Sequence, residues 1–148
     1  MARYVTKVRT RRPAAEVFAF MADLRHFAEW DPGVRKVAQV QGSGGGAGAV
    51  FDVTVAGIRE TTLRYRTVEY RAPEELLVVA KSVFLTSTDR ITVRSEGETT
   101  VVTYDADLKL NGPLGLADPF LRMALRTIGD RAAAGLRRAL DGQDATGG

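Results

Sequence analysis

Three side chains of types that can transfer protons stand out in this sequence: His26, Tyr65 and Asp89. His26 is the single histidine, which excludes a histidine cluster for a metal, and it is either an acid or base at a cavity mouth or a surface residue. Asp89 either points inward, where burial raises its pKa and allows proton exchange, or is solvated near the start of a strand. Tyr65 either orients a ligand or is a core tyrosine bonded to a backbone carbonyl.

Two other motifs suggest chemistry that their context does not support. Residues 42–47 fit G-x-G-x-x-A, a form of the dinucleotide-binding fingerprint, which needs a helix directly after the glycines. Residues 50–56 instead alternate between apolar and polar side chains, so the glycine run is predicted to be a hairpin loop, and no cofactor is expected. Asp105 and Asp107 have a spacing that suits acid–base work, but the opposite parity of their segment is apolar, so both are expected to face water.

The elements that must position these residues follow from hydrophobic periodicity. Pro13 is expected to begin a short helix, and Asp23 to cap a second short helix that ends at Trp30. From Pro119, apolar residues at steps of three and four predict a long amphipathic helix whose inner face includes Ile128. Alternation at period two predicts strands over residues 4–9, 34–40, 50–56, 58–70, 76–84, 89–94 and 99–110.

Composition limits the class of protein. The chain has 148 residues, 45% apolar and 26% charged, which suits one soluble domain, predicted over residues 1–141 with a frayed tail at 142–148. There is no cysteine and no apolar run long enough to span a bilayer, so a cytoplasmic protein without integral membrane association is expected. Lys7, Arg9, Arg11 and Arg12 form the densest basic cluster, but no aromatic residues interleave with them, so nucleic-acid binding is not expected.

These elements predict an α+β fold. About seven antiparallel strands with one apolar face need a cover, and the last helix is the one long apolar element available. A curved sheet around that helix leaves a space lined by side chains from both. Trp30, at the end of the second short helix, is either packing or part of the entrance to this space.

Three stretches carry a resemblance to a known superfamily: residues 11–37 (RRPAAEVFAFMADLRHFAEWDPGVRKV), 68–79 (VEYRAPEELLVV) and 99–140. They are similar to the START-like, or birch-pollen-allergen-like, helix-grip proteins (SRPBCC), most closely to the bacterial polyketide cyclase/dehydrase group. The resemblance implies a helix-grip fold with two short helices after the first strand. It implies no invariant catalytic motif, because this fold hosts lipid carriers, aromatase/cyclases and quinone-binding proteins.

The expected function is binding of a small hydrophobic or aromatic ligand, such as a lipid, quinone or polyketide-like compound, between the sheet and the C-terminal helix. The alternative is a cofactor-independent polyketide aromatase/cyclase or dehydratase, for which the sequence names no catalytic residue. No metal is expected, and the oligomeric state is not inferred. The candidate ligand-binding residues are Tyr65, Trp30, Thr61, Leu63, Thr67, His26, Asp89, Tyr104, Leu121 and Leu125.

Overall fold

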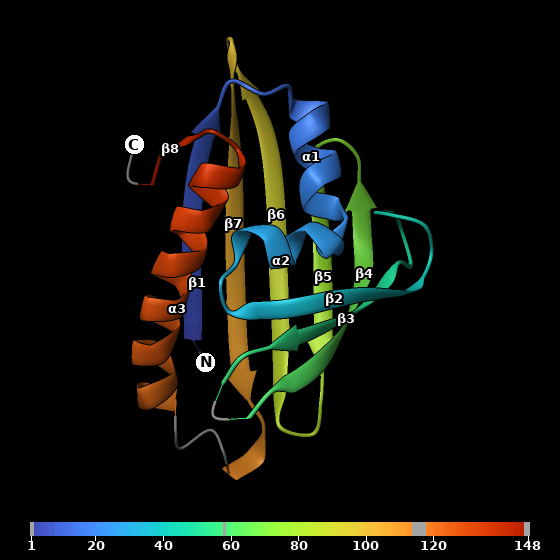
Figure 1. Ribbon diagram of the computed structural model, residues 1–148, viewed down its shortest axis with the longest axis vertical. Helices are drawn as coiled ribbons and strands as arrows, with labels where there is room; N and C mark the ends of the chain where they lie inside the picture. The colour runs from blue at the N-terminus through green and yellow to red at the C-terminus, as the bar shows by residue number, and fades with distance from the viewer. Residues whose placement is uncertain (1, 58, 114–117, 147–148) are drawn as a thin grey trace.

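The fold is a curved antiparallel sheet that carries its helices on the concave side (Figure 1). A computed structural model describes residues 2–57, 59–113 and 118–146. The helices are α1 (Ala14–Ala22), the 3-10 turn η1 (Leu24–His26), α2 (Phe27–Trp30) and α3 (Asp118–Ala139). The strands are β1 (Ala2–Thr10), β2 (Val34–Gln41), β3 (Val50–Val55), β4 (Thr61–Arg71), β5 (Glu75–Lys81), β6 (Leu85–Glu96), β7 (Thr99–Leu110) and β8 (Gln143–Asp144).

The sheet has the order β2-β3-β4-β5-β6-β7-β1-β8, so β1 closes it beside the last long strand. Consecutive strands from β2 to β7 pair as antiparallel neighbours, as short connections favour. The α+β helix-grip prediction is therefore confirmed, with one difference in strand number. Within the described residues, the sheet contains 8 strands rather than the expected seven, because residues after α3 add a short strand to the edge.

That extra strand lies in the segment expected to be a frayed tail, residues 142–148. Gln143 pairs with Arg9, and the amide of Ala145 donates to the carbonyl of Lys7 at 2.9 Å. The hydroxyl of Thr146 accepts a hydrogen bond of 2.9 Å from the Lys7 amide. The described part of the tail is thus attached to the outer edge of β1.

The glycine run forms the loop between β2 and β3, as predicted. Gly42, Gly44, Gly46 and Gly48 all have positive φ, which a residue with a side chain rarely adopts. The amide side chain of Gln39 braces the loop, because it donates to the Gly44 carbonyl and accepts from the Gly44 amide, each at 2.9 Å. A strand follows these glycines directly, so the loop does not have the geometry of a dinucleotide-binding turn.

The short helices cover the concave face of the sheet with a few apolar side chains. Val17, Phe18 and Met21 of α1 are buried, and the turn after α1 is capped because Asp23 accepts a hydrogen bond of 3.1 Å from the Arg25 amide. In Figure 1, α2 lies in front of β6, and β2 and β3 cross the same face of the curved sheet below it.

The long helix α3 packs on β1 and α2 rather than across the middle of the sheet (Figure 1). Its C-terminal half supplies the buried Leu136, but its first half is poorly covered: Phe120 and Met123 are 76% and 73% exposed. Ile128, expected on the buried face, is 50% exposed. The apolar periodicity predicted the helix correctly but not how far along it the core extends.

Close approach between α3 and α2 depends on one glycine. A Cβ atom built on Gly135 would lie 1.8 Å from the carbonyl oxygen of Trp30, so no other residue fits without backbone movement. Gly129 has a similar role six residues earlier, because its absent Cβ makes room for the ring of Tyr4. Glycine is otherwise a poor helix former, so these positions are explained by packing.

We expect Gly135→Ala to destabilise the protein by about 2 kcal/mol or more, measured as the free energy of unfolding in urea, because the clash involves backbone. In an unobstructed helix interior the same change would stabilise by up to about 1 kcal/mol. The matched control is Thr127→Ala on the exposed face of α3, which should stabilise by a few tenths of a kcal/mol. A Gly135→Ala protein as stable as the parent would contradict the packing argument.

Candidate functional site

A chain of hydrogen bonds crosses the concave face of the sheet from β4 to β7. The hydroxyl of Tyr65 donates to Ser87 Oγ at 2.9 Å, and Ser87 Oγ donates to Asp89 Oδ1 at 3.1 Å. The hydroxyl of Tyr104 donates to the other carboxylate oxygen, Asp89 Oδ2, in a short contact. All four side chains are buried, so a carboxylate at the centre of the sheet is held by two hydroxyl groups, from β6 and β7, and the third hydroxyl, from β4, supports the serine.

Strand register explains how these side chains meet. Tyr65 pairs across the strands with Ala80, and Ala80 pairs with Ser87, so the tyrosine ring can pass over a small side chain to reach the serine. Asp89 stands opposite another alanine, Ala106, on β7. Residues two apart on a strand share a face, which places Ser87 beside Asp89. The two alanines leave room for the larger polar groups between them.

Burial dominates the electrostatics of Asp89, which is 2% exposed. Removal from water disfavours the ionised form and raises the pKa of Asp89 to about 6, while the hydroxyls of Tyr104 and Ser87 lower it in part. The nearby carboxylates of Asp31 and Asp105 raise it further. Burial likewise raises the pKa of Asp31, although the Gly33 amide donates to its Oδ1 at 2.8 Å.

A small cavity lies beside this carboxylate, beneath the short helices rather than beneath α3. Its volume is about 10 Å³, room for about one water molecule. The indole of Trp30 forms part of the wall, stacks on Phe27 with ring centres 4.7 Å apart and meets Tyr104 edge-on at 5.4 Å. The residues that line the cavity are Met21, Leu24, Phe27, Trp30, Val78, Asp89, Ile91 and Tyr104.

Several of the candidate residues chosen from the sequence come together here. Asp89 points inward, so the solvated alternative is wrong, and Tyr65 bonds to a side chain rather than to a backbone carbonyl. Leu63 is buried on the same face of β4 as Tyr65. Thr67 is also buried, and its hydroxyl has no hydrogen-bond partner among the described residues.

Four candidates lie elsewhere. Thr61 is exposed at the first position of β4, where its hydroxyl donates to the Arg59 carbonyl at 3.3 Å. Leu121 and Leu125 are half-buried on the first half of α3 and do not line the cavity. These three share a face or a periodicity with core residues but lie beyond the end of the core.

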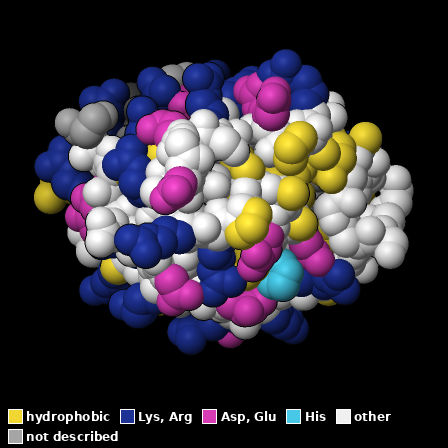
Figure 2. Space-filling model, turned by 90° about the horizontal axis from the view of Figure 1, so that it is seen from above, with side chains coloured by type: hydrophobic (Ala, Val, Ile, Leu, Met, Phe, Trp, Pro, Cys, Tyr) yellow, Lys and Arg dark blue, Asp and Glu magenta, His cyan; other side chains and the backbone are white. Residues whose placement is uncertain are grey.

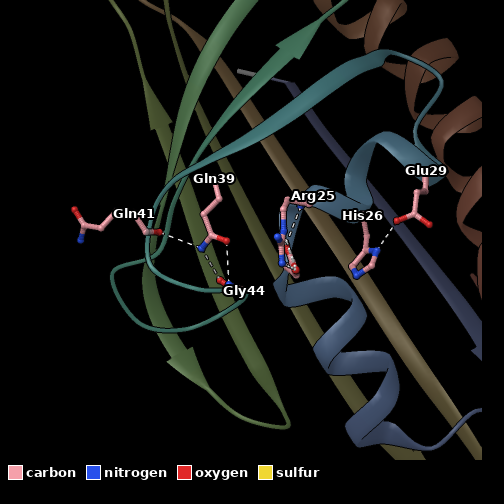
Figure 3. Close-up of polar contacts among 7 residues, drawn as sticks. Arg25, His26, Glu29, Gln39, Gln41 and Gly44 are labelled. Carbon is pink, nitrogen blue, oxygen red and sulfur yellow. Dashed lines mark hydrogen bonds and ion pairs between the residues drawn. The ribbon is translucent and has the colours of Figure 1, made fainter.

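His26, the fourth, is a surface residue. Its ring stacks on Phe20 at 4.5 Å and its Nδ1 contacts the carboxylate of Glu29 (Figure 3). Figure 2 shows it, as the single cyan side chain, on the outside of the molecule beside acidic side chains. The surface alternative for His26 is therefore correct, and its contacts within the described part of the chain do not include Asp89.

Ser87 and Asp31 are polar residues of this region that were not among the candidates chosen from the sequence. The sequence pattern predicts a strand that begins at Asp89, which leaves Ser87 outside it, whereas β6 begins at Leu85. The parity of Ser87 with Asp89 is the signal that could have identified it. Among the residues that the structure describes, no three acidic or histidine side chains gather as a metal site would require.

Residues 1–141 match the family model for polyketide cyclase/dehydrase and lipid transport proteins. The chain belongs to this family. The match covers the whole sheet except β8, together with the three helices and η1. No curated protein matches the chain. In the described part of the chain, no helix is long and apolar enough to cross a membrane.

Solved structures share the fold at low sequence identity. A START superfamily protein from Mycobacterium smegmatis has a TM-score of 0.72 at 14% identity, over 95% of this chain and 98% of its own. The Zhui aromatase/cyclase from Streptomyces sp. R1128 has a TM-score of 0.72 at 16% identity, over 93% and 90%. The di-domain aromatase/cyclase StfQ of the steffimycin biosynthetic pathway has 0.71 at 14%, over 95% and 49%. This likeness establishes a START-like helix-grip fold.

The raised pKa of Asp89 predicts a pH-dependent stability. Between the ordinary aspartate value of 3.8 and about 6, the folded protein binds more protons than the unfolded chain, so the free energy of unfolding falls as the pH rises through this range. At about 1.4 kcal/mol per pH unit, the ionisation of Asp89 lowers the free energy of unfolding by on the order of 3 kcal/mol across this range. In Asp89→Asn this contribution is lost.

Urea unfolding of both proteins at several pH values from 4 to 7 measures this contribution. The stability of the wild type relative to Asp89→Asn should decrease as the pH rises through this range. Parallel curves for the two proteins would show that Asp89 titrates with an unshifted pKa.

Proposed function

We propose that this protein binds a small apolar or aromatic molecule that carries a polar oxygen or nitrogen function, on the concave side of the sheet. The observation that supports this most is the carboxylate of Asp89, buried with two hydroxyl partners, Ser87 and Tyr104, beside a cavity walled by aromatic rings. The apolar part of the ligand would contact Trp30 and Phe27, and the polar function would reach Tyr65 or Tyr104. Apolar burial, at ~25 cal/mol per Å², would supply most of the affinity.

The free-energy cost of burying Asp89 and its hydroxyl partners supports a role for them beyond folding. Desolvation of a carboxylate is costly, and apolar residues of similar volume often fill such positions with equal or greater stability. The sheet around Asp89 is otherwise built from Val78, Ile91 and Ala106, so an apolar side chain would fit its surroundings. Hydrogen-bonded polar side chains in an otherwise apolar core are typical of binding and catalytic sites.

A ligand larger than water requires side chains to move apart. The inward-facing Leu85, Leu108 and Leu110 are half-buried, whereas Val8 and Val102 near the other end of the strands are fully buried. At the same end as these leucines, Val83 and Phe84 stand 85% and 64% exposed in the turn between β5 and β6. We therefore place the access route at the end of the sheet that carries this turn.

Binding can be tested before the ligand is identified. Native mass spectrometry of the purified protein, followed by solvent extraction, should reveal a co-purified apolar molecule. Because Trp30 is the single tryptophan and lies in the cavity wall, its fluorescence should change when the extracted molecule is added back to stripped protein. A protein that neither carries nor rebinds any apolar molecule would contradict the proposal.

The hydroxyl of Tyr65 should contribute to this binding. Tyr65→Phe should weaken the affinity for the extracted molecule roughly tenfold, the usual effect of one lost hydrogen bond. Tyr70→Phe is the matched control: Tyr70 lies on the same strand and packs on Phe18 with ring centres 5.4 Å apart, and this variant should bind as the wild type does. Equal losses in both variants would indicate a general packing effect.

Catalysis is the second candidate function, favoured by one observation: a buried carboxylate with a pKa of about 6 borders the cavity. Such a group can accept a proton from a substrate and return it during a cyclisation or dehydration. With a poly-β-ketone substrate, Asp89→Asn should lower kcat by roughly 10²–10⁴-fold, the range typical of a lost general base, with KM little changed. Unchanged turnover in this variant would exclude Asp89 as the base.

A further inference from the structure

The donor and the acceptor of each hydrogen bond in the buried chain from Tyr65 to Tyr104 can be assigned by counting the hydroxyl protons. An ionised carboxylate can only accept hydrogen bonds, so the contacts of Asp89 with Ser87 and Tyr104 must both be donated to it. Ser87 has one hydroxyl proton, which is used on Asp89. The remaining contact must therefore be donated by Tyr65 to Ser87. The ionised Asp89 thus fixes the direction of every hydrogen bond in the chain.

The same count shows what the chain can offer to another molecule. The hydroxyl protons of Tyr65, Ser87 and Tyr104 are all used, whereas the phenol oxygens of Tyr65 and Tyr104 keep unused lone pairs. With a pKa of about 6, Asp89 is ionised at pH 7.5. Two other carboxylates, those of Asp31 and Asp105, act on Asp89, and Arg3 pairs with the second of them. The ionised Asp89 itself therefore makes the potential at the hydrogen-bonded chain negative.

We infer that the ligand presents a hydrogen-bond donor, a hydroxyl, phenol or N–H group, to the oxygen of Tyr65 or Tyr104, and that it carries no carboxylate or phosphate there. This inference rests on the proposed function and narrows its ligand class. If the polar groups of a molecule are ketones alone, its carbonyl oxygen would face the lone pairs of the tyrosine oxygens, and no hydrogen bond would form. An anion would face the charge of Asp89.

Thr67 provides an independent check because its buried hydroxyl has no partner among the described residues. Its proton is uncommitted, so it could donate to a carbonyl. Thr67 lies two residues from Tyr65 on the same face of β4, but register separates it from the carboxylate: Thr67 pairs with Val78, and Val78 pairs with Asp89, so Thr67 and Asp89 stand about 10 Å apart across two strand spacings. A ketone that bound at Thr67 would therefore be distinguished from one bound at the chain by the variant Thr67→Val.

Three probes of similar shape test the inference by isothermal titration calorimetry at pH 7.5: 2-naphthol, which donates, 2-acetylnaphthalene, which only accepts, and the anion 2-naphthoate. Wild-type protein should bind 2-naphthol at least tenfold more tightly than 2-acetylnaphthalene and should not bind 2-naphthoate measurably. Thr67→Val should keep this order. A ketone or an anion that binds wild type as tightly as 2-naphthol overturns the inference and leaves the proposed function intact.

The variant Asp89→Asn should reduce or reverse the preference. An amide brings its own N–H donors, so one hydroxyl of the chain no longer has to donate toward residue 89 and can donate to a ligand carbonyl instead. We expect the ratio of the two affinities, 2-naphthol over 2-acetylnaphthalene, to fall at least tenfold in Asp89→Asn. An unchanged ratio in a folded variant would contradict the proton count.

A measurement without ligand keeps the inference separate from the proposed function. The ¹³C chemical shift of the Asp89 carboxyl carbon, assigned by comparison with Asp89→Asn, should be that of a carboxylate at pH 7.5, and the hydroxyl protons of Tyr65 and Tyr104 should exchange slowly with water. A protonated Asp89 at that pH overturns the inference. If the carboxylate is ionised but no probe or extracted molecule binds, the proposed function fails, and the inference about its ligand fails with it.

Discussion

The desolvation of one carboxylate is the constraint on which this site depends. Asp89 lies at the centre of the sheet, where its charge is stable only if hydroxyl groups reach both of its oxygens. Tyr104 and Ser87 provide these contacts, and Ser87 in turn needs Tyr65. Two alanines on the intervening positions make the contacts possible, because larger residues would hold the tyrosine rings away. The hydrogen bonds to Asp89 therefore depend on the two alanines as well as on the hydroxyl groups.

The helices act on this arrangement indirectly. α1, η1 and α2 close the cavity over Asp89 with Met21, Leu24 and Trp30, and so separate the carboxylate from bulk water. α3 does not line the cavity, but it presses on α2 where Gly135 meets the backbone of Trp30. A shift of α3 would thus displace the backbone of Trp30 and its indole ring in the cavity wall. This differs from the expected arrangement, in which the long helix itself formed the roof of the space.

Much of the fold could be predicted from the sequence, and the reasons are local. Alternation along β4 and β7 identified the inward faces that hold Tyr65 and Tyr104, and the strand after the glycine run excluded a nucleotide turn. The failures came where a local pattern continues beyond the core. Leu121 and Thr61 have the correct periodicity, but the neighbouring elements end before they can cover these side chains. Periodicity gives the direction of a side chain and cannot show whether another element lies above it.

The short strand β8 has a consequence for how the molecule behaves in solution. An uncovered strand at the border of a sheet can pair with the same strand of another molecule and start aggregation. Here β8 occupies the border beside Val8 and Arg9, and the opposite border strand, β2, carries the exposed Arg35 and Lys36 and two irregularities of register. In the described part of the chain, both borders of the sheet thus carry features that disfavour pairing with another molecule: C-terminal residues beside Lys7–Arg9 of β1, and charge with irregular register on β2.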